Sequence, residues 1–208
     1  MPALTIAVPR GALLGETLDL LDTLGIDTAE VRANDRKLLF EDAGLVTMRP
    51  SDVPTYVEAG AADLGITGKD VLAEHPERDV YELLDLGFGP CRMVFATVEG
   101  EDPAAEALRR LGVMRIATKY PRIAAAYFER TGRQAEIVEV KGSVELAPLT
   151  GLVEGIVDLT ATGTTLRENG LVIREEIALS TARLIANPVS YRVKAAEIDA
   201  VVRQLRAR

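Results

Sequence analysis

The chain has 208 residues, of which 48% are hydrophobic and 27% are charged, and it is long enough to bury one large core or two smaller ones. A formal net charge of -8 argues against a general surface for nucleic acid or an anionic membrane, and 4% aromatic residues disfavour a base-stacking platform. One cysteine and one histidine exclude an internal disulfide and a zinc site built from several such ligands. Neither a signal peptide nor a membrane span is visible, so we expect a cytoplasmic protein.

In the first half of the chain, short apolar runs alternate with helical patterns. The apolar runs predict strands at 4–8 and 62–67. Helices are predicted from 13 to 24 and, capped by Ser51 or Asp52, from there to Gly60. Each helix is expected to stop at a glycine that follows it.

The same alternation continues in the second half. Asp102 and Pro103 suit the N-cap and first position of a helix that ends at Gly112, and Asn187-Pro188 is expected to break the chain before the last helix. The remaining pattern predicts strands at 91–98, 115–118, 136–140, 156–159 and 182–186, and helices at 121–130, 143–149 and 194–208.

Strands separated by helices indicate an α/β fold with mainly parallel sheets. A repeated spacing, G-x-x-D-L-x-x-T-G, occurs at 60–68 and again at 155–163. It predicts the same strand-to-helix corner in each half, and hence two similar lobes that face each other across a ligand cleft. The alternative is that a short strand followed by Thr-Gly recurs by chance.

The segment 156–166 carries the clearest chemical signal. A buried strand leads into several small hydroxyl residues and Gly163 at the start of a predicted helix, where backbone N–H groups and hydroxyls can converge on a phosphate. Asp158, at the end of the strand, suits the hydroxyls of a ribose better than a phosphate. Phosphate and ribose together indicate a phosphoribosyl group, while the alternative is an ordinary helix capped by threonine.

Two common nucleotide-binding loops are excluded by their spacing. Gly68-Lys69 is not part of a Walker A motif, because Asp63 and Asp70 stand where that motif needs Gly and Ser or Thr. The run 87–89 lacks the third glycine of a dinucleotide-binding fingerprint. A Rossmann-type oxidoreductase is therefore disfavoured.

Six segments spread over nearly the whole chain resemble the corresponding segments of the ATP phosphoribosyltransferase family. Members of that family catalyse the first step of histidine biosynthesis. The last segment is similar to the family signature E-x(5)-G-x-[SAG]-x(2)-[IV]-x-D-[LIV]-x(2)-[ST]-G-x-T-[LM]. The chain departs from the family at Val153, where a smaller residue is preferred, and at Arg10, where lysine is common. The six segments are 9–13, 49–54, 60–70, 86–89, 115–121 and 145–166.

The resemblance implies a two-lobed, type II periplasmic-binding-protein-like fold. Lobe I is expected to comprise 1–93 and 180–208, and lobe II, with the phosphoribosyl loop, 94–179. Because about one helix follows Pro188, the chain resembles the short form of the family, without a C-terminal regulatory domain. Short forms act with a regulatory subunit related to histidyl-tRNA synthetase, so we expect catalytic-subunit homodimers within a hetero-oligomer, commonly a hetero-octamer.

The implied reaction is attack of adenine N1 of ATP on C1 of 5-phosphoribosyl 1-diphosphate (PRPP), which releases diphosphate. It needs cations, Mg²⁺ bound with the substrate phosphates, and oriented N–H groups rather than a His or Cys nucleophile. No residue of the chain is assigned as a metal ligand. The residues implied are Arg36 and Arg49 for the leaving diphosphate; Ala161, Thr162, Gly163, Thr164 and Thr165 for the 5-phosphate; Asp158 for the ribose; and Arg10, Gly11, Lys69 and Asp70 for the ATP side.

Other interpretations remain open at this stage. Without the family context, Arg36 and Arg49 are more typical of solvated surface charges. The loop also resembles that of purine-salvage phosphoribosyltransferases, although these usually have two adjacent acids where this chain has Val157 and Asp158. A two-lobed solute-binding protein is a further alternative, but such proteins are normally exported.

Overall fold

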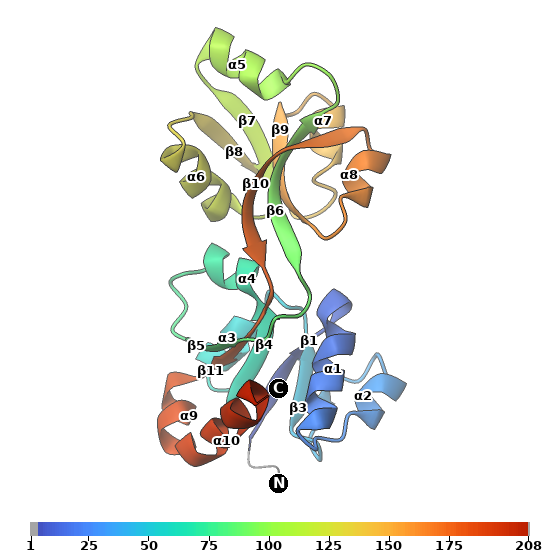
Figure 1. The fold of residues 1–208 in the computed structure, drawn as a ribbon, viewed down its shortest axis with the longest axis vertical. Helices are drawn as coiled ribbons and strands as arrows, with labels where there is room; N and C mark the ends of the chain where they lie inside the picture. Colours follow the sequence, from blue (N-terminus) through green and yellow to red (C-terminus); the bar gives the residue numbers. More distant parts are fainter. Residues whose placement is uncertain (1–3, 208) are drawn as a thin grey trace. The chain divides into compact units, whose positions relative to one another are not determined.

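The structure, a computed structural model, describes residues 4–207 (Figure 1). The chain divides into two compact units. Unit 1 comprises the residues up to Gly89 and those from Thr181 onward, and unit 2 runs from Pro90 to Ser180. Among the described residues, every helix is too short or too polar to cross a membrane.

Unit 1 contains a six-stranded sheet with the order β2-β3-β1-β4-β11-β5. The three central strands β3, β1 and β4 run parallel, whereas β2, β11 and β5 pair antiparallel with their neighbours. The strands are β1 (Ile6–Pro9), β2 (Leu39–Phe40), β3 (Leu45–Met48), β4 (Leu64–Gly68), β5 (Tyr81–Asp85) and β11 (Ala182–Ala186).

Helices pack on both faces of this sheet because alternate strand residues point to opposite sides. Ile6 and Val8 of β1 join one apolar cluster with residues of α1, α2 and α10, while Ala7 joins another cluster with α3. The helices of unit 1 are η1 (Gly11–Leu13), α1 (Leu14–Thr23), α2 (Ala29–Ala33), α3 (Val53–Glu58), α4 (Lys69–Glu74), α9 (Pro188–Val193) and α10 (Ala195–Arg206).

Unit 2 contains a five-stranded sheet with the order β10-β6-β9-β7-β8. Strands β9, β7 and β8 run parallel, and β6 and β10 extend the sheet by antiparallel pairing. The strands are β6 (Cys91–Val98), β7 (Met114–Thr118), β8 (Ala135–Glu139), β9 (Gly155–Thr160) and β10 (Leu171–Ser180). The lobe limits expected from sequence, 93/94 and 179/180, thus fall inside β6 and near the end of β10.

The helices of unit 2 also cover both faces of its sheet. One apolar cluster joins the sheet to α5 and α6, and another joins it to α7 and α8. As predicted, Asp102 caps α5 by accepting from the N–H groups of Ala104 and Ala105, and Gly112 ends the helix in the left-handed conformation. The helices are α5 (Pro103–Leu111), α6 (Pro121–Arg130), α7 (Leu146–Leu149) and α8 (Thr164–Glu168).

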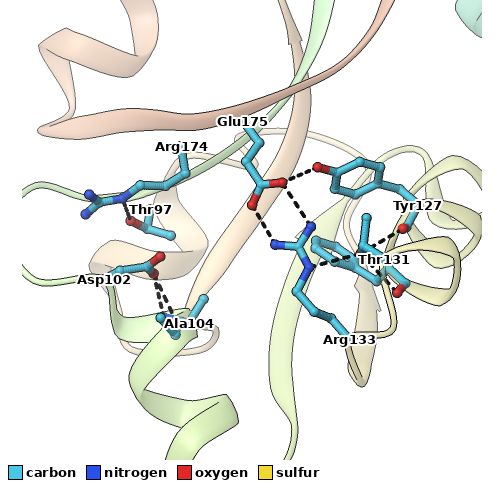
Figure 2. A network of polar contacts seen from close by, with 10 residues as sticks. Thr97, Asp102, Ala104, Tyr127, Thr131, Arg133, Arg174 and Glu175 are labelled. Atoms are coloured by element: carbon cyan, nitrogen blue, oxygen red, sulfur yellow. Dashed lines mark hydrogen bonds and ion pairs between the residues drawn. The ribbon is translucent and has the colours of Figure 1, made fainter.

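A half-buried polar network connects the irregular strand β10 to the rest of unit 2 (Figure 2). The Arg133 guanidinium pairs with both oxygens of Glu175, at 2.5 and 3.0 Å, and Tyr127 donates its hydroxyl proton to the same carboxylate. Glu175 lies between two register shifts of the β10–β6 ladder. The opposite charges of Arg133 and Glu175 neutralise each other, so we assign the network a structural role.

The predicted α/β class is confirmed, but the sheets contain more antiparallel pairing than expected. Four strands were not predicted, namely β2, β3, β5 and β10. Of these, β3 pairs parallel with β1, whereas β2, β5 and β10 pair antiparallel with their neighbours. The break expected at Asn187-Pro188 is instead the start of α9, because the Asn187 side chain accepts from the N–H groups of Val189 and Ser190. Pro188 fits there as the first helical residue.

Candidate active site

The carboxyl ends of the parallel strands in unit 2 bring three loops to one edge of the sheet. Lys119 follows β7, the segment 140–145 follows β8, and Ala161 follows β9. Because these strands are neighbours in the order β9-β7-β8, the residues that follow them lie side by side. In open α/β sheets this is the edge where ligands bind.

The loop between β9 and α8 is shaped by its own side chains. The hydroxyl oxygen of Thr160 accepts from the Gly163 N–H at 2.8 Å, and the hydroxyls of Thr162 and Thr164 lie 2.9 Å apart. Arg167 donates to the Thr162 carbonyl and to the Thr164 hydroxyl, both at 3.0 Å. These contacts define the shape of the loop.

Gly163 suits the turn of this loop because its φ of +74° lies in the left-handed region, which disfavours residues with a Cβ. Around it, Ala161, Thr162, Thr164 and Thr165 are exposed. The first N–H groups of α8 have no acceptor within the helix, and that of Thr164 donates to the Thr162 hydroxyl at 3.3 Å. Exposed hydroxyls thus surround one turn, as is typical of a phosphate-binding loop.

Asp158 is a buried carboxylate with few partners. Its residue is 7% exposed, Oδ1 accepts from the N–H of Leu159 at 2.9 Å, and Oδ2 lies 3.9 Å from the ammonium of Lys119, too far for a hydrogen bond. Burial raises the pKa of Asp158 and Glu145 adds to this, against the opposing effects of Lys119 and the Leu159 N–H. A ligand that donates two hydroxyl groups would satisfy the free acceptor sites.

Lys119 is a site residue that the sequence analysis did not single out. Its side chain is 40% exposed, and its ammonium lies 3.9 Å from Oδ2 of Asp158. The sequence does place Lys119 directly after a predicted strand. That this strand, β7, lies next to β9, and hence that Lys119 lies near Asp158, depends on the sheet order. Linear sequence does not give that order.

The carboxyl edge of the sheet in unit 1 gathers basic residues. Arg10, Arg49 and Lys69 directly follow β1, β3 and β4, three parallel neighbours. Arg36 lies at the same edge, because the carbonyls of its two chain neighbours, Asp35 and Lys37, accept hydrogen bonds from the Arg10 guanidinium. The structure therefore brings together the four basic residues predicted in this unit.

These four cations differ in how far they are already paired. The Lys69 ammonium lies 2.6 Å from a Glu82 oxygen, and the Arg10 guanidinium donates to Thr47 and to two backbone carbonyls. Across residues 4–207, the guanidinium groups of Arg36 and Arg49 have neither a hydrogen-bond acceptor nor an ion-pair partner, and both residues are exposed. Arg36 and Arg49 are thus available to an anionic ligand.

The two remaining predicted residues of unit 1 have conformational roles. Gly11 adopts a φ of +78°, which turns the chain from β1 into the helical segment that follows. The Asp70 carboxylate folds back over Gly68, where an added Cβ would lie 2.1 Å from Oδ1 of Asp70. A cavity of about 420 Å³ lies beside Arg10 and Gly11, between α1 and α2.

The donor set does not form a resident metal site in the part of the chain that is described. Residues 4–207 contain no group of three or more His, Cys, Asp or Glu side chains placed to hold an ion. One or two carboxylates with substrate phosphates are sufficient for Mg²⁺, and Asp158 lies at the edge where phosphate would bind. The chain thus fits a metal that arrives with its substrate.

The repeated G-x-x-D-L-x-x-T-G spacing occupies different positions in the two units. Gly68 and Gly163 both precede a helix, as predicted. However, β4 begins after Asp63 and runs up to Gly68, whereas β9 contains Asp158 and ends at Thr160. The two aspartates therefore lie at opposite ends of their strands, and the prediction of one shared corner is wrong in this respect.

Comparison with known proteins identifies the family. The family model described as HisG, ATP phosphoribosyltransferase, matches residues 49–207. The chain belongs to the ATP phosphoribosyltransferase family. It is 55% identical over 201 residues to the ATP phosphoribosyltransferase of Rubrobacter xylanophilus, covering 95% of this chain and 93% of the relative, and 49% identical to that of a Geobacillus strain, covering 97% of both.

Solved structures support the family and the fold. The ATP phosphoribosyl transferase (HisG:HisZ) complex from Thermotoga maritima contains a chain that is 35% identical to this one, with a TM-score of 0.81 and coverage of 98% of this chain and 97% of that chain. The periplasmic aliphatic sulphonate binding protein SsuA from Escherichia coli is 12% identical, with a TM-score of 0.62, covering 97% of this chain and 70% of its own. The latter likeness confirms the predicted periplasmic-binding-protein-like fold and says nothing of function.

Proposed function

We propose that this chain transfers the 5-phosphoribosyl group of PRPP to N1 of the adenine of ATP, giving phosphoribosyl-ATP and diphosphate in the first step of histidine biosynthesis. The observation that carries the proposal is the buried, sparsely partnered carboxylate of Asp158 beside a loop of exposed hydroxyls. This pair of features matches a ribose joined to a phosphate. Family membership supplies the identity of the two substrates.

The loop residues Ala161 to Thr165 hold the 5-phosphate of PRPP in this proposal. The exposed hydroxyls and the first amides of α8 donate to phosphate oxygens, and the left-handed Gly163 lets the backbone turn around them. Asp158 accepts from the ribose hydroxyls, and Lys119 keeps that carboxylate ionised when the site fills.

Arg36 and Arg49 stabilise the leaving diphosphate. Adenine N1 carries a free lone pair, so the reaction needs alignment of two polyanions and neutralisation of the charge that develops as the C1–O bond breaks. Unpaired guanidinium groups at one sheet edge provide such charge, and their planar donors suit diphosphate oxygens. Arg10, Gly11, Lys69 and Asp70 contribute to the ATP side more weakly, because Arg10 and Lys69 are already engaged with protein groups.

Mg²⁺ bound with the substrate phosphates would supply charge neutralisation for the leaving group. The chain's own contribution at that point is the two arginines.

The proposed assembly is based on the relative in the HisG:HisZ complex. We propose that this chain forms catalytic homodimers that join a regulatory subunit related to histidyl-tRNA synthetase in a hetero-octamer, in the cytoplasm. The 35% identity and 0.81 TM-score to that HisG chain support a shared mode of assembly. Regulation by histidine then resides on the partner chain.

Diphosphate release tests the proposal. Purified protein is assayed with ATP, PRPP and Mg²⁺, each omitted in turn, with and without the cognate regulatory subunit, and the product is identified by mass spectrometry. We expect release only when all three are present, with phosphoribosyl-ATP as the product. If no release occurs even with the regulatory subunit, the activity is wrong; binding of a solute without turnover would then favour a binding protein.

A further inference from the structure

We infer that Arg10 is a positioning residue that fixes the backbone on both sides of Arg36. This inference rests on the role proposed above for Arg36 and adds to it. Arg10 follows β1 and donates through three different nitrogens. Its Nε donates to the Thr47 hydroxyl at 2.9 Å, one terminal nitrogen donates to the carbonyl of Asp35, and the other donates to the carbonyl of Lys37 at 2.6 Å.

The two carbonyls that Arg10 holds belong to the residues immediately before and after Arg36. A guanidinium is planar and presents its donors as a rigid fork, so it fixes the separation of the two carbonyls as well as their direction. Arg10 is itself anchored, because its backbone N–H donates to the Met48 carbonyl at 2.7 Å. The loop around Arg36 is thereby tied to the central strands β1 and β3.

The other backbone groups of this loop are held as well. The side-chain oxygen of Asn34 accepts from the N–H groups of Arg36 and Lys37, both at 3.1 Å, and the Lys37 ammonium pairs with Glu30 at 2.5 Å. Within the described part of the chain, the Arg36 guanidinium alone among these groups is left without a protein partner. The loop thus presents one cation on a fixed backbone, the arrangement that precise placement against a substrate requires.

The contacts of Arg10 argue against a direct substrate contact as its main role. Three of its five N–H donors already bind protein oxygens, one on each of its three nitrogens. Lysine at this position would keep one donor to the loop but lose the fork. Arg10→Lys is therefore expected to retain part of the function, and Arg10→Gln less.

A double-mutant cycle separates the two roles. Turnover is measured for the wild type, Arg10→Gln, Arg36→Ala and the double variant, in the complex with the regulatory subunit. We expect Arg10→Gln to lower kcat about 10-fold with KM for ATP changed less than about 2-fold, because a misplaced group costs rate rather than binding. In the Arg36→Ala background, the same change should lower kcat less than 2-fold.

The outcomes distinguish this inference from the proposed function. If the two effects multiply, Arg10 acts on the substrate independently and the inference is overturned. If Arg36→Ala itself keeps full turnover, the role of Arg36 in the proposed function fails instead. Arg10→Lys provides the rescue, with a kcat expected between those of the wild type and Arg10→Gln; a kcat equal to that of Arg10→Gln would contradict the positioning role.

A second measurement does not depend on activity. Trypsin cleaves after Arg36 and Lys37, and the fixed loop should protect both bonds. Arg10→Gln is expected to raise the rate of cleavage there at least 5-fold, mapped by mass spectrometry, while the thermal midpoint stays within about 2 °C. Arg78→Gln, whose side chain pairs with Glu58 on the same unit, is the control and should not change cleavage at this loop. Unchanged cleavage in Arg10→Gln would overturn the inference even if the variant lost activity.

Discussion

Two aspartates with the same sequence context, Asp63 in unit 1 and Asp158 in unit 2, differ in how their charge is used. Asp63 accepts from the Lys194 ammonium at 2.8 Å, the Ser190 hydroxyl at 2.7 Å and the Thr5 N–H at 2.8 Å. Burial alone would raise the pKa of Asp63, but these three hydrogen bonds outweigh it and lower the pKa. Asp158 accepts one N–H, and its pKa is raised.

The difference arises from where each strand begins. β4 starts after Asp63, which puts this carboxylate at the amino end of the strand, where α9 covers it. β9 starts earlier relative to its motif, so Asp158 lies near the carboxyl end, beside the loops. The same sequence motif therefore gives a structural ion pair at Asp63 in unit 1 and a carboxylate with unused hydrogen-bond acceptor sites at Asp158 in unit 2. A motif indicates chemistry only where its groups are left free by the fold.

Replacing Asp158 should produce the largest functional effect. Asp158→Asn removes a charged acceptor for two ribose hydroxyls, each worth about 1.5–3 kcal/mol, so turnover at subsaturating PRPP should fall about 100-fold or more. Because the variant also removes a buried charge, its thermal midpoint should equal or exceed that of the wild type. Steady-state kinetics measures the first effect and thermal unfolding the second. Wild-type kinetics in Asp158→Asn would show that Asp158 does not bind the substrate.

The unpaired arginines should matter more than the paired lysine at the same sheet edge. Arg49→Ala should lower kcat by about one to two orders of magnitude, since a charge-assisted hydrogen bond to the leaving diphosphate contributes about 1.5–3 kcal/mol. Lys69→Ala should change kcat only a few-fold, because Glu82 already neutralises that ammonium. Arg109→Ala, on the exposed face of α5, serves as the surface control. Equal losses in Arg49→Ala and Lys69→Ala would contradict the distinction.

The hydroxyl loop should contribute to binding rather than to turnover. Thr162→Val removes one donor to the 5-phosphate, and the Kd for PRPP should rise about 10-fold. Thr150→Val is a matched control, because its hydroxyl bonds to the carbonyls of Leu146 and Ala147 outside the loop. Calorimetry that gives the same Kd for Thr162→Val and the wild type would count against the loop assignment.

Asp63 should affect stability and leave the chemistry intact. Asp63→Asn leaves the Lys194 ammonium without its partner, and since that side chain is 37% exposed we expect a loss of about 2 kcal/mol, or about 4–8 °C in thermal midpoint. The kcat of the folded variant should stay within about 2-fold of the wild type. A large loss of kcat at unchanged stability would show that the two aspartates are not functionally distinct.

The smallest expected effect is the opposite pH dependence of the two sites. Since the pKa of Asp63 is lowered, its contribution to stability is present above the ordinary value of 3.8 and is lost as the pH falls through the lowered pKa. The raised pKa of Asp158 has the opposite sign, so its contribution is present below 3.8 and is lost as the pH rises through the raised pKa. Urea unfolding at a series of pH values around 3.8 gives the free energy of unfolding of the wild type and of each Asn variant. The difference between wild type and variant should rise with pH for Asp63→Asn and fall with pH for Asp158→Asn. Differences that change in the same direction would contradict the assignment.

Much of the fold could be predicted because local signals agree with it. Strand 91–98, helix 121–130 and strand 182–186 have the predicted limits, and the Asp102 cap is as expected. The missed strand β10 has mixed burial and two register shifts, so its periodicity is weak. The short β2 is likewise defined by its partner β3 rather than by its own two residues.

Most site residues could be proposed from the sequence. Which of their charged side chains are left without a protein partner, and so can bind a ligand, could not. Whether a cation is free depends on partners far along the chain, as Glu82 is for Lys69 and the Asp35 and Lys37 carbonyls are for Arg10. Lys119 was missed for the same reason, since the sheet order brings it beside Asp158. Long-range pairing decides which charged residues remain for function.

Calorimetric titration of PRPP with Mg²⁺ into the wild type, Asp158→Asn and Asp63→Asn is the sharpest test of the difference between the two aspartates. Asp158→Asn should weaken binding at least about 50-fold, since two charge-assisted hydrogen bonds are weakened, and Asp63→Asn should bind as the wild type does. Wild-type affinity in Asp158→Asn, or an equal loss in both variants, would contradict that difference.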